Sequence, residues 1–500
     1  MDVWERPDPA RVIRLATTSD WQQLARLYPT LAGRPQRPFD RCLEVARQAG
    51  ARSVVIETRY IDRDFRSDYA AHHSRSFLTI PGTTHRLHFF SRAIARQHLA
   101  RLPSAAGYLG YMVIRPREVA RVGRSVLVPP PALDAGLRVR VIDNVDLFGQ
   151  PLTVEGAPFM AQDREFLRCA HVDAWMCHYS AALRGDLGRR NSAWFALNAQ
   201  PGLGRPVPSP GLNLFQVSEL LRTSGLPSVL HDIEQLPRTS TALTLHWVPS
   251  PTAPAPTDPN QHPGYWDYRI IRVCCRYLNS GLPIIVATAG HVFVLVGYRR
   301  VPRAGMPDWI ELMRHDDEVG PYTEVGDIFS DPEGYTPWQW IIAPLPERIW
   351  LSGELAEYVA GRLLEVRSSV WSAQVPTAGE VSSLIASRDL SLHTYVTLST
   401  RFKRGLAARG MDQRLAREYR LSRMPRYVWV VEAVDRRLRS SGRPPVVGEV
   451  ILDATSTDMD WRVVAVHLPG VAAIYRTNGR VRFPIQCGPR PYMTGGVGPP

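Results

Sequence analysis

The sequence predicts an α+β fold divided into several compact segments. Its 500 residues are several times the size of a typical domain, and 44% of them are hydrophobic, enough to form large cores. Segments with helical periodicity alternate along the chain with short apolar segments typical of strands. Proline-rich loops at 200–210 and 249–263 interrupt its middle. We therefore expect three segments, at residues 1–150, 151–346 and 347–500.

The first segment is expected to form an α/β domain. Its apolar spacing predicts a helix over 41–49. Runs of β-branched and aromatic residues predict strands over 53–60, 86–90 and 110–116, and Pro116 ends the last of them. No motif in this segment indicates its role.

The third segment is also expected to be an α/β domain. A predicted helix over 353–367 is followed by apolar strands, among them 427–431 and 463–466. This segment likewise contains no motif that indicates its role. The chemistry suggested by the sequence is therefore concentrated in the middle segment.

Composition limits the compartment and the partners. The formal net charge is +13, and all basic residues except Lys403 are arginine, which is typical of a GC-rich genome and suggests a bacterial protein. The first residues lack the pattern of a signal peptide, and the longest apolar stretch, 281–298, contains Gly, Pro and His, so we expect no membrane span. Six cysteines without a C-x-x-C pair favour a reducing cytoplasm. No metal and no organic cofactor are expected.

The strongest candidate nucleophile is Cys169. Ala170, Ala174, Cys177 and Ala181 recur at helical spacing, which predicts a closely packed helix that starts near Cys169. In the first turn of a helix, unsatisfied N–H groups and the positive end of the dipole favour a thiolate. The alternative is that Cys169 is a small packing residue, as we expect for Cys177.

A histidine and nearby aspartates are the candidate partners of this cysteine. His291 follows a predicted turn at Ala289–Gly290 and begins an apolar strand, where a polar ring needs a hydrogen-bond partner. Asp316 follows a predicted strand over 309–314 and is the expected carboxylate that orients the imidazole. Asp317 and Asp331 are competing candidates for that role. The alternatives are a histidine bonded to a backbone carbonyl and a solvated acidic turn.

These residues resemble the papain-like cysteine peptidases, in particular the double-glycine-leader peptidases of bacteriocin exporters. Leu278-Asn-Ser-Gly281-Leu-Pro283-Ile-Ile and His291-Val-Phe-Val-Leu-Val-Gly297-Tyr298 match the block that carries the general base of that family. The resemblance covers residues 158–346 and implies a helix bearing Cys169 packed on an antiparallel sheet bearing His291. It implies that Cys169 is the nucleophile and that His291 is the base and then the acid. It further implies that Asp316 orients the ring and that Gln162, with the Cys169 backbone N–H, binds the oxyanion.

The chain also departs from that family. Gln162 stands seven residues before Cys169 instead of the usual six, and Ala170-His171 replaces the usual Gly-Pro. A single lysine, in Phe402-Lys403-Arg404, leaves no nucleotide-binding P-loop, so bacteriocin export is not the expected role.

Three functions remain open at this point. The favoured one is a thiol-dependent hydrolase, most simply a cytoplasmic bacterial cysteine peptidase that acts on a protein or peptide. The second is a papain-fold acyltransferase, transglutaminase or deamidase, which would share the same thioester intermediate. The third is a non-catalytic basic module that binds nucleic acid or another anionic partner. It is favoured least, because no nucleic-acid motif accompanies the charge.

Overall fold

The computed structural model divides the chain into two compact units. It describes residues 4–493 except 5–7, 30–36, 78, 103–106, 118–120, 200–206, 237–262, 304–305, 326–337, 388, 436, 438–444, 458–462, 476–480 and 489–491. Unit 1 holds Met1–Leu230 and Leu282–Pro344, and unit 2 holds His231–Gly281 and Leu345–Pro500. The chain therefore passes between the units three times. These bounds differ from the expected segments 1–150, 151–346 and 347–500.

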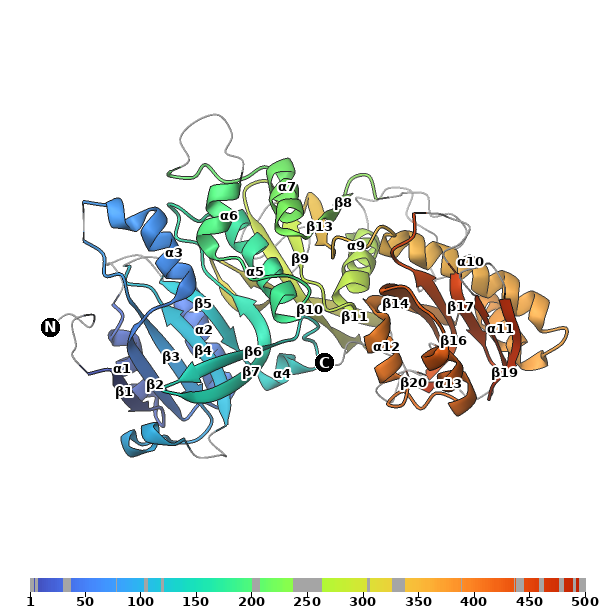
Figure 1. Ribbon diagram of the computed structural model, residues 1–500, viewed down its shortest axis with the longest axis horizontal. Coiled ribbons are helices and arrows are strands. Elements are labelled where there is room, and N and C mark those ends of the chain that lie inside the picture. The colour runs from blue at the N-terminus through green and yellow to red at the C-terminus, as the bar shows by residue number, and fades with distance from the viewer. Residues whose placement is uncertain are drawn as a thin grey trace. The chain divides into compact units, whose positions relative to one another are not determined.

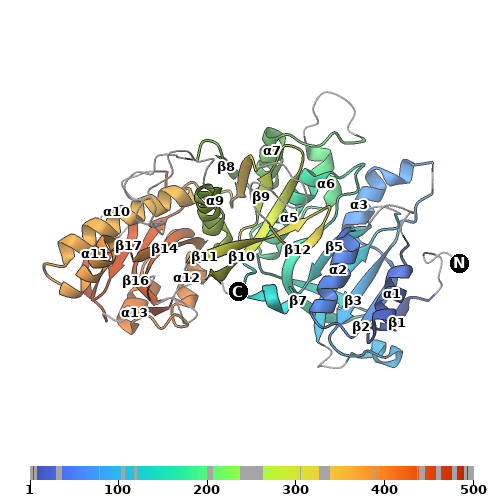
Figure 2. The same ribbon diagram turned by 180° about the vertical axis from the view of Figure 1, so that it is seen from behind.

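The α+β class predicted from the sequence is confirmed, and the sheets are antiparallel (Figures 1 and 2). The first sheet of unit 1 has the order β1 (Ala10–Arg14), β2 (Ser53–Tyr60), β3 (Thr84–Phe90), β4 (Tyr108–Ile114), β5 (Val122–Leu127), β7 (Gln150–Phe159), β6 (Val141–Leu147). The second has the order β12 (Gly320–Glu324), β11 (Met306–Asp316), β10 (Val292–Arg303), β9 (Ile284–Ala287), β13 (Trp340–Pro344), β8 (Ser228–Asp232).

The helices of unit 1 cover these sheets. They are α1 (Thr18–Arg26), α2 (Arg37–Gln48), α3 (Arg63–Ala71), α4 (Pro131–Asp134), α5 (Cys169–Leu183), α6 (Ser192–Asn198) and α7 (Leu214–Ser224). Helices α1 and α2 lie in front of the first sheet in Figure 2. Helix α5 packs against β7 of the first sheet and against β9 and β10 of the second. It is therefore the central helix of the unit.

Buried hydrogen bonds join the two sheets of unit 1. The hydroxyl of Tyr322, in β12, donates to Leu127 O at 2.7 Å and accepts from Ala157 N at 2.9 Å. Nδ1 of His315, in β11, donates to Pro158 O at 3.0 Å. Because β5 and β7 of the first sheet are bonded in this way to β11 and β12 of the second, residues on both sides of position 150 form one body.

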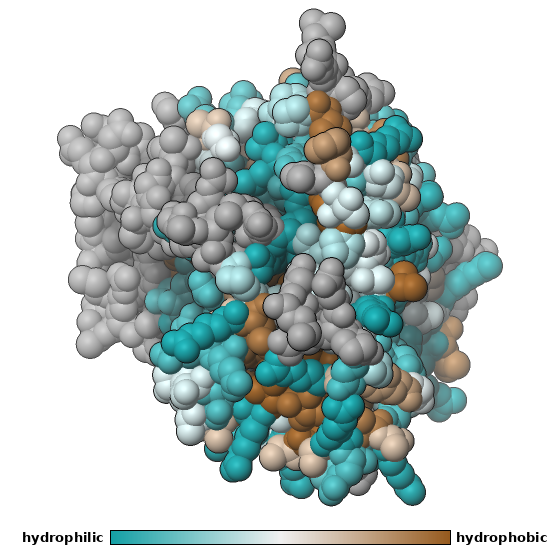
Figure 3. Space-filling view, turned by 90° about the vertical axis from the view of Figure 1, so that its left-hand side faces the viewer, coloured by the Kyte–Doolittle hydropathy of each residue, from teal (hydrophilic) through white to brown (hydrophobic). Residues whose placement is uncertain are grey.

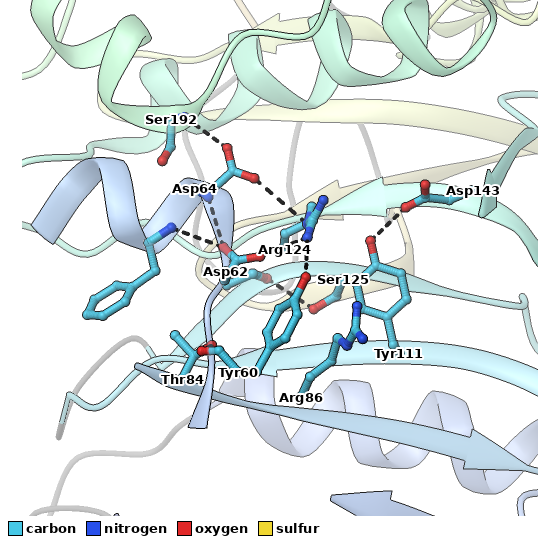
Figure 4. A network of polar contacts seen from close by, with 12 residues as sticks. Tyr60, Asp62, Asp64, Thr84, Arg86, Tyr111, Arg124, Ser125, Asp143 and Ser192 are labelled. Carbon is cyan, nitrogen blue, oxygen red and sulfur yellow. Dashed lines mark hydrogen bonds and ion pairs between the residues drawn. The ribbon is translucent and has the colours of Figure 1, made fainter. Parts of the chain in front are cut away.

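A buried polar network also ties the N-terminal part of unit 1 to α5, and Figure 4 shows the part of it around Arg124. Nη2 of Arg124 donates to Asp62 Oδ2 at 2.9 Å and to the hydroxyl of Tyr60 at 3.0 Å. Asp64 accepts from the indole N–H of Trp175 at 3.1 Å and from Ser192 N at 2.9 Å. Trp175 lies in the second turn of α5, so this network fixes the helix that begins at Cys169.

Unit 2 is a seven-stranded sheet between helices. The sheet order is β14 (Leu390–Leu398), β15 (Tyr427–Asp435), β16 (Pro445–Asp453), β17 (Val463–Leu468), β18 (Val471–Tyr475), β19 (Val481–Gln486), and β20 (Tyr492–Met493) pairs with β16. Its helices are α9 (Pro263–Leu278), α10 (Gly353–Trp371), α11 (Gly379–Ala386), α12 (Ser399–Gly405) and α13 (Gln413–Leu421). Phe402, Leu415 and Tyr419 of α12 and α13 pack on Val428 and Val430 of β15.

Helix α9 belongs to unit 2 because of a buried ionic network with α10. The guanidinium of Arg276 donates to Glu357 at 2.7 and 3.1 Å and to Glu354 at 3.3 Å. The hydroxyl of Tyr277 donates to Glu354 at 2.8 Å, and Thr394 of β14 donates to Glu357 at 3.0 Å. Removing one partner of such a buried ion pair typically costs about 3–5 kcal/mol.

The opposite face of the unit 2 sheet carries a row of polar side chains in register. His393, Glu432, Glu449 and His467 are direct cross-strand neighbours on β14 to β17. Arg409 bridges the row, because its Nη2 lies 2.7 Å from Oε1 of Glu432 and 2.6 Å from Oε2 of Glu449. This row packs among apolar residues, so Arg409 is the cation that allows two glutamates to be buried side by side.

The helices and one face of unit 1 bear on the expectation of no membrane span. Within the described residues, no helix combines the length and the apolar character needed to cross a bilayer. Seen from the end of unit 1, most of the coloured surface is hydrophilic, and hydrophobic residues gather mainly in the lower half of the view (Figure 3).

Candidate functional site

Cys169 occupies the first position of α5, as the sequence predicted. The preceding loop is shaped by Asp163, whose Oδ1 accepts from the backbone N–H groups of Glu165, Phe166 and Leu167 at 2.7–2.9 Å. The backbone N–H of Arg168 donates to Nδ1 of His171 at 3.2 Å, and burial lowers the pKa of His171 to about 4, so this ring is neutral. Cys169 itself is partly exposed, whereas most of the helix behind it is buried.

A tight turn between β9 and β10 holds His291. The hydroxyl of Thr288 accepts from His291 N at 3.2 Å and donates to His291 O at 2.9 Å. Thr288 N also donates to His291 O at 2.9 Å. These three bonds fix the backbone on both sides of the imidazole, immediately before the strand that carries it into the sheet.

Asp316 is the carboxylate that binds this imidazole. It is the last residue of β11, and its Oδ1 lies 3.1 Å from Nε2 of His291. The same oxygen accepts from Glu318 N at 3.0 Å and Val319 N at 3.3 Å, so the turn after β11 fixes the carboxylate. Asp317, the competing candidate, lies farther away, with its Oδ1 3.9 Å from Nε2.

The structure brings His291 and Cys169 into hydrogen-bond contact. Burial of His291 opposes protonation, but hydrogen bonds to Asp316 and to Cys169 and the charges of Asp317 and Asp316 together raise its pKa. Desolvation would raise the pKa of Asp316, but the hydrogen bond and charge of His291 lower it. These opposite shifts describe an imidazolium paired with a carboxylate, next to a thiol at a helix start.

Two further acids, Asp173 and Asp317, lie beside this group, and Asp173 was not among the residues predicted from the sequence. Asp173 follows Cys169 by one helical turn and interacts electrostatically with Asp317, Cys169 and His291. Burial raises the pKa of Asp173 well above its usual range and, with smaller effects from neighbouring charges, raises that of Asp317 to about 8. The spacing of four residues from Cys169 was the available signal, because such residues share one helix face.

The structure describes the surroundings of Gln162 but not those of Asp331. Nε2 of Gln162 donates to Oε1 of Glu318 at 2.8 Å, so its amide lies beside the turn that follows Asp316. One amide hydrogen is used in this bond, and an oxyanion role would require the other. Asp331 falls in 326–337, outside the described residues.

Two groups of side chains have a spacing that suits a metal ion. The first is His291, Asp316 and Asp317, and all three residues are buried. The second is His72, His73 and Glu165, in which Glu165 is exposed. Neither group was predicted to bind a metal, because each combines residues from separate segments of the chain: His291 with Asp316 and Asp317, and His72 and His73 with Glu165.

Comparison of the chain with protein-family models, with curated proteins and with solved structures finds no match. The function must therefore be inferred from the geometry of the site.

Proposed function

We propose that this chain is a thiol-dependent hydrolase, most simply a papain-like cysteine peptidase, with Cys169 as nucleophile. The observation that supports this most strongly is the chain of hydrogen bonds from Cys169 to His291 and from His291 Nε2 to Asp316 at 3.1 Å. A nucleophile, a base and an orienting carboxylate in this order are the parts of a catalytic triad. The partial exposure of Cys169 favours access by a substrate.

The reaction begins with attack of the Cys169 thiolate on a carbonyl carbon. A carbon–sulfur bond forms, and the carbonyl oxygen becomes an oxyanion, which the N–H groups at the start of α5 can stabilise. As the tetrahedral intermediate collapses, the bond to the leaving amine breaks and the His291 imidazolium donates its proton to that amine. The acyl group remains on Cys169 as a thioester.

Water completes the cycle. Neutral His291 takes a proton from a water molecule, whose oxygen attacks the thioester carbonyl. The carbon–sulfur bond breaks, the carboxylic acid leaves, and the thiolate and the imidazolium are restored. Asp316 keeps the ring oriented and stabilises its charge throughout. An amine in place of water would give acyl transfer, and a side-chain amide as the substrate would give deamidation.

The test uses p-nitrophenyl acetate as a generic acyl donor with the full-length protein. Mass spectrometry should find one acetyl group on Cys169, and the Cys169→Ala variant should lose both the acetyl group and hydrolysis. Cys275→Ala is the matched control, because Cys275 is also partly exposed but lies in unit 2. Equal hydrolysis by wild type and Cys169→Ala would refute the proposal. Incubation with peptides and amines then separates cleavage, transfer and deamidation by their mass changes.

A further inference from the structure

Three aspartates surround His291, although the proposed triad uses only one. Asp316 and Asp317 lie 3.1 and 3.9 Å from Nε2 of the ring. Asp173 interacts electrostatically with both of them and with His291. The exposed fractions of Asp173, Asp316 and Asp317 are 0%, 0% and 1%. The site therefore holds more buried carboxylates than the proposed hydrolysis requires.

Most oxygens of these carboxylates have no hydrogen-bond donor among the described residues. This applies to both oxygens of Asp173, both of Asp317 and Oδ2 of Asp316. The nearest recorded guanidinium, that of Arg314, has its Nε 3.7 Å from Oδ2 of Asp316. Buried carboxylates without donors are costly, and proteins usually pair them or use them to bind a metal ion.

We propose that His291, Asp316 and Asp317 bind a divalent transition-metal ion, and that this ion reversibly inactivates the thiol site. Their ligand atoms all lie within 4.8 Å of one another. Tetrahedral zinc, with bonds of about 2.0–2.1 Å, places neighbouring ligand atoms about 3.3 Å apart, close to the 3.1 and 3.9 Å found here. One imidazole nitrogen with two carboxylates suits Zn²⁺ better than Ca²⁺ or Mg²⁺, which prefer oxygen ligands alone.

The second candidate metal group is less suited to a cation. An arginine already neutralises it, because Nη2 of Arg117 lies 2.9 Å from Oε2 of Glu165 and Nη1 lies 3.1 Å from Nδ1 of His73. The Glu165 side chain is also 51% exposed, so water competes for its oxygens. A cation at this second group would have to displace the guanidinium. Glu165 therefore provides a matched control position.

The ion would act on the base of the proposed triad, and this part of the inference rests on the proposed function. A metal bonded to Nε2 replaces the proton there and takes up the electron pair of that nitrogen. The ring keeps one proton on Nδ1 and can accept no second one, so it cannot serve as the base for the thiol or for water. The displaced proton passes to solvent, and no oxidation or reduction takes place. A chelator that removes the ion restores the imidazole.

Equilibrium dialysis of the chelator-treated, full-length protein against Zn²⁺ tests the binding itself. We expect one tightly bound ion per chain in the wild type and at least about 10-fold weaker binding in Asp317→Asn, because loss of a direct ligand should cost no less than loss of a residue that only orients a ligand, which costs about 10- to 100-fold. Glu165→Gln should bind as the wild type does. Equal binding by wild type and Asp317→Asn, or loss of binding in Glu165→Gln, would overturn the proposal. Circular dichroism of each variant establishes that it is folded.

A second measurement uses only the wild type, so it does not depend on a variant. Co²⁺ bound to the protein should produce the intense visible absorption of a four-coordinate site, and added Zn²⁺ should displace it and remove that absorption. A spectrum no different from that of aqueous Co²⁺ would overturn the proposal. Hydrolysis of p-nitrophenyl acetate should fall with bound Zn²⁺ and recover with EDTA, and full activity of the zinc-saturated enzyme would overturn the inactivation. If the protein binds the metal but its metal-free form does not hydrolyse the ester, only the proposed hydrolase is refuted. Hydrolysis without metal binding would refute only the metal site.

Discussion

Replacing Asp316 or its neighbour Asp317 by asparagine tests which carboxylate orients His291. Both changes are isosteric and remove one negative charge, but only Asp316 is hydrogen-bonded to the ring, at 3.1 Å. The carbonyl oxygen of an asparagine at 316 can still accept from Glu318 N and Val319 N, so the turn should persist. Because that same oxygen lies against Nε2 of His291, Asp316→Asn keeps a hydrogen-bond acceptor at the ring and removes the negative charge paired with it.

The size of the effect follows from that contact. A hydrogen bond to a charged group contributes about 1.5–3 kcal/mol, so weakening it by removal of the charge can slow the reaction by up to about 10- to 150-fold. Loss of the correct ring tautomer can add to this and bring the total to about 10⁴-fold, the value known for the equivalent change in a serine protease. Asp317, at 3.9 Å and without a hydrogen bond, should affect the rate less than about tenfold.

The assay is the steady-state hydrolysis of p-nitrophenyl acetate, with EDTA present so that no metal ion contributes. Titration with a thiol probe, after subtraction of the thiols titrated in Cys169→Ala, gives the concentration of accessible Cys169, so that rates can be expressed per active thiol. Asp316→Asn should be at least tenfold slower than Asp317→Asn. If Asp317→Asn is the slower of the two, or if neither changes the rate, the assignment of Asp316 as the orienting acid is wrong.

Three further predictions concern residues that support the two units. Thr288→Val should slow hydrolysis about 5- to 15-fold, since it removes the two hydrogen bonds of the hydroxyl to the backbone of His291, whereas Thr153→Val on β7 should not. Burial raises the pKa of Asp64 from 3.8 to about 6. The protonated carboxyl therefore stabilises unit 1 fully below about pH 4, and this stabilisation is lost as the pH rises to about 6. Asp64→Asn should remove most of this pH-dependent change in the stability of unit 1, which amounts to about 3 kcal/mol. The measurement is pulse proteolysis in urea with mass spectrometry of unit 1 peptides, and a pH profile equal to that of the wild type would contradict the prediction. Arg409→Met should destabilise unit 2 by about 3–5 kcal/mol, because it leaves the two glutamates that it bridges without their cation, and replacing both glutamates by glutamine in the same variant should restore most of the loss. If unit 2 loses the same free energy of unfolding with and without the glutamine replacements, the arginine acts through packing alone.

Local pattern predicted much of the secondary structure. The predicted strand over 53–60 coincides with β2 (Ser53–Tyr60), and the predicted helix that starts near Cys169 is α5. These predictions succeed because apolar periodicity and turn residues act over a few neighbouring positions. The predicted strand over 309–314 is the middle of β11, which extends to Asp316 through its pairing with β10.

The parts that could not be predicted depend on partners far apart in the sequence. The division into units follows from contacts such as Arg276 with Glu357, about 80 residues later, which no local pattern reveals. Asp173 was overlooked because a single carboxylate in a helix is usually exposed, and only the packing of α5 buries it beside His291. The role of Thr288 became visible only from the turn geometry.

The path of the chain between the two units has a practical consequence for anyone who expresses fragments. Residues 231–281, which include α9, lie in sequence between Cys169 and His291 but belong to unit 2. A fragment cut at 151–346 would retain α9, whose Arg276 would have lost both of its glutamate partners, and would lack β1 to β6 of the first sheet, of which β6 also contacts α5. A smaller fragment that keeps Cys169, His291 and Asp316 should instead be sought by replacing 231–281 with a short flexible linker in a chain that ends after Pro344. During synthesis, β9 and β10, which flank His291, must likewise leave the ribosome before that histidine can meet Cys169.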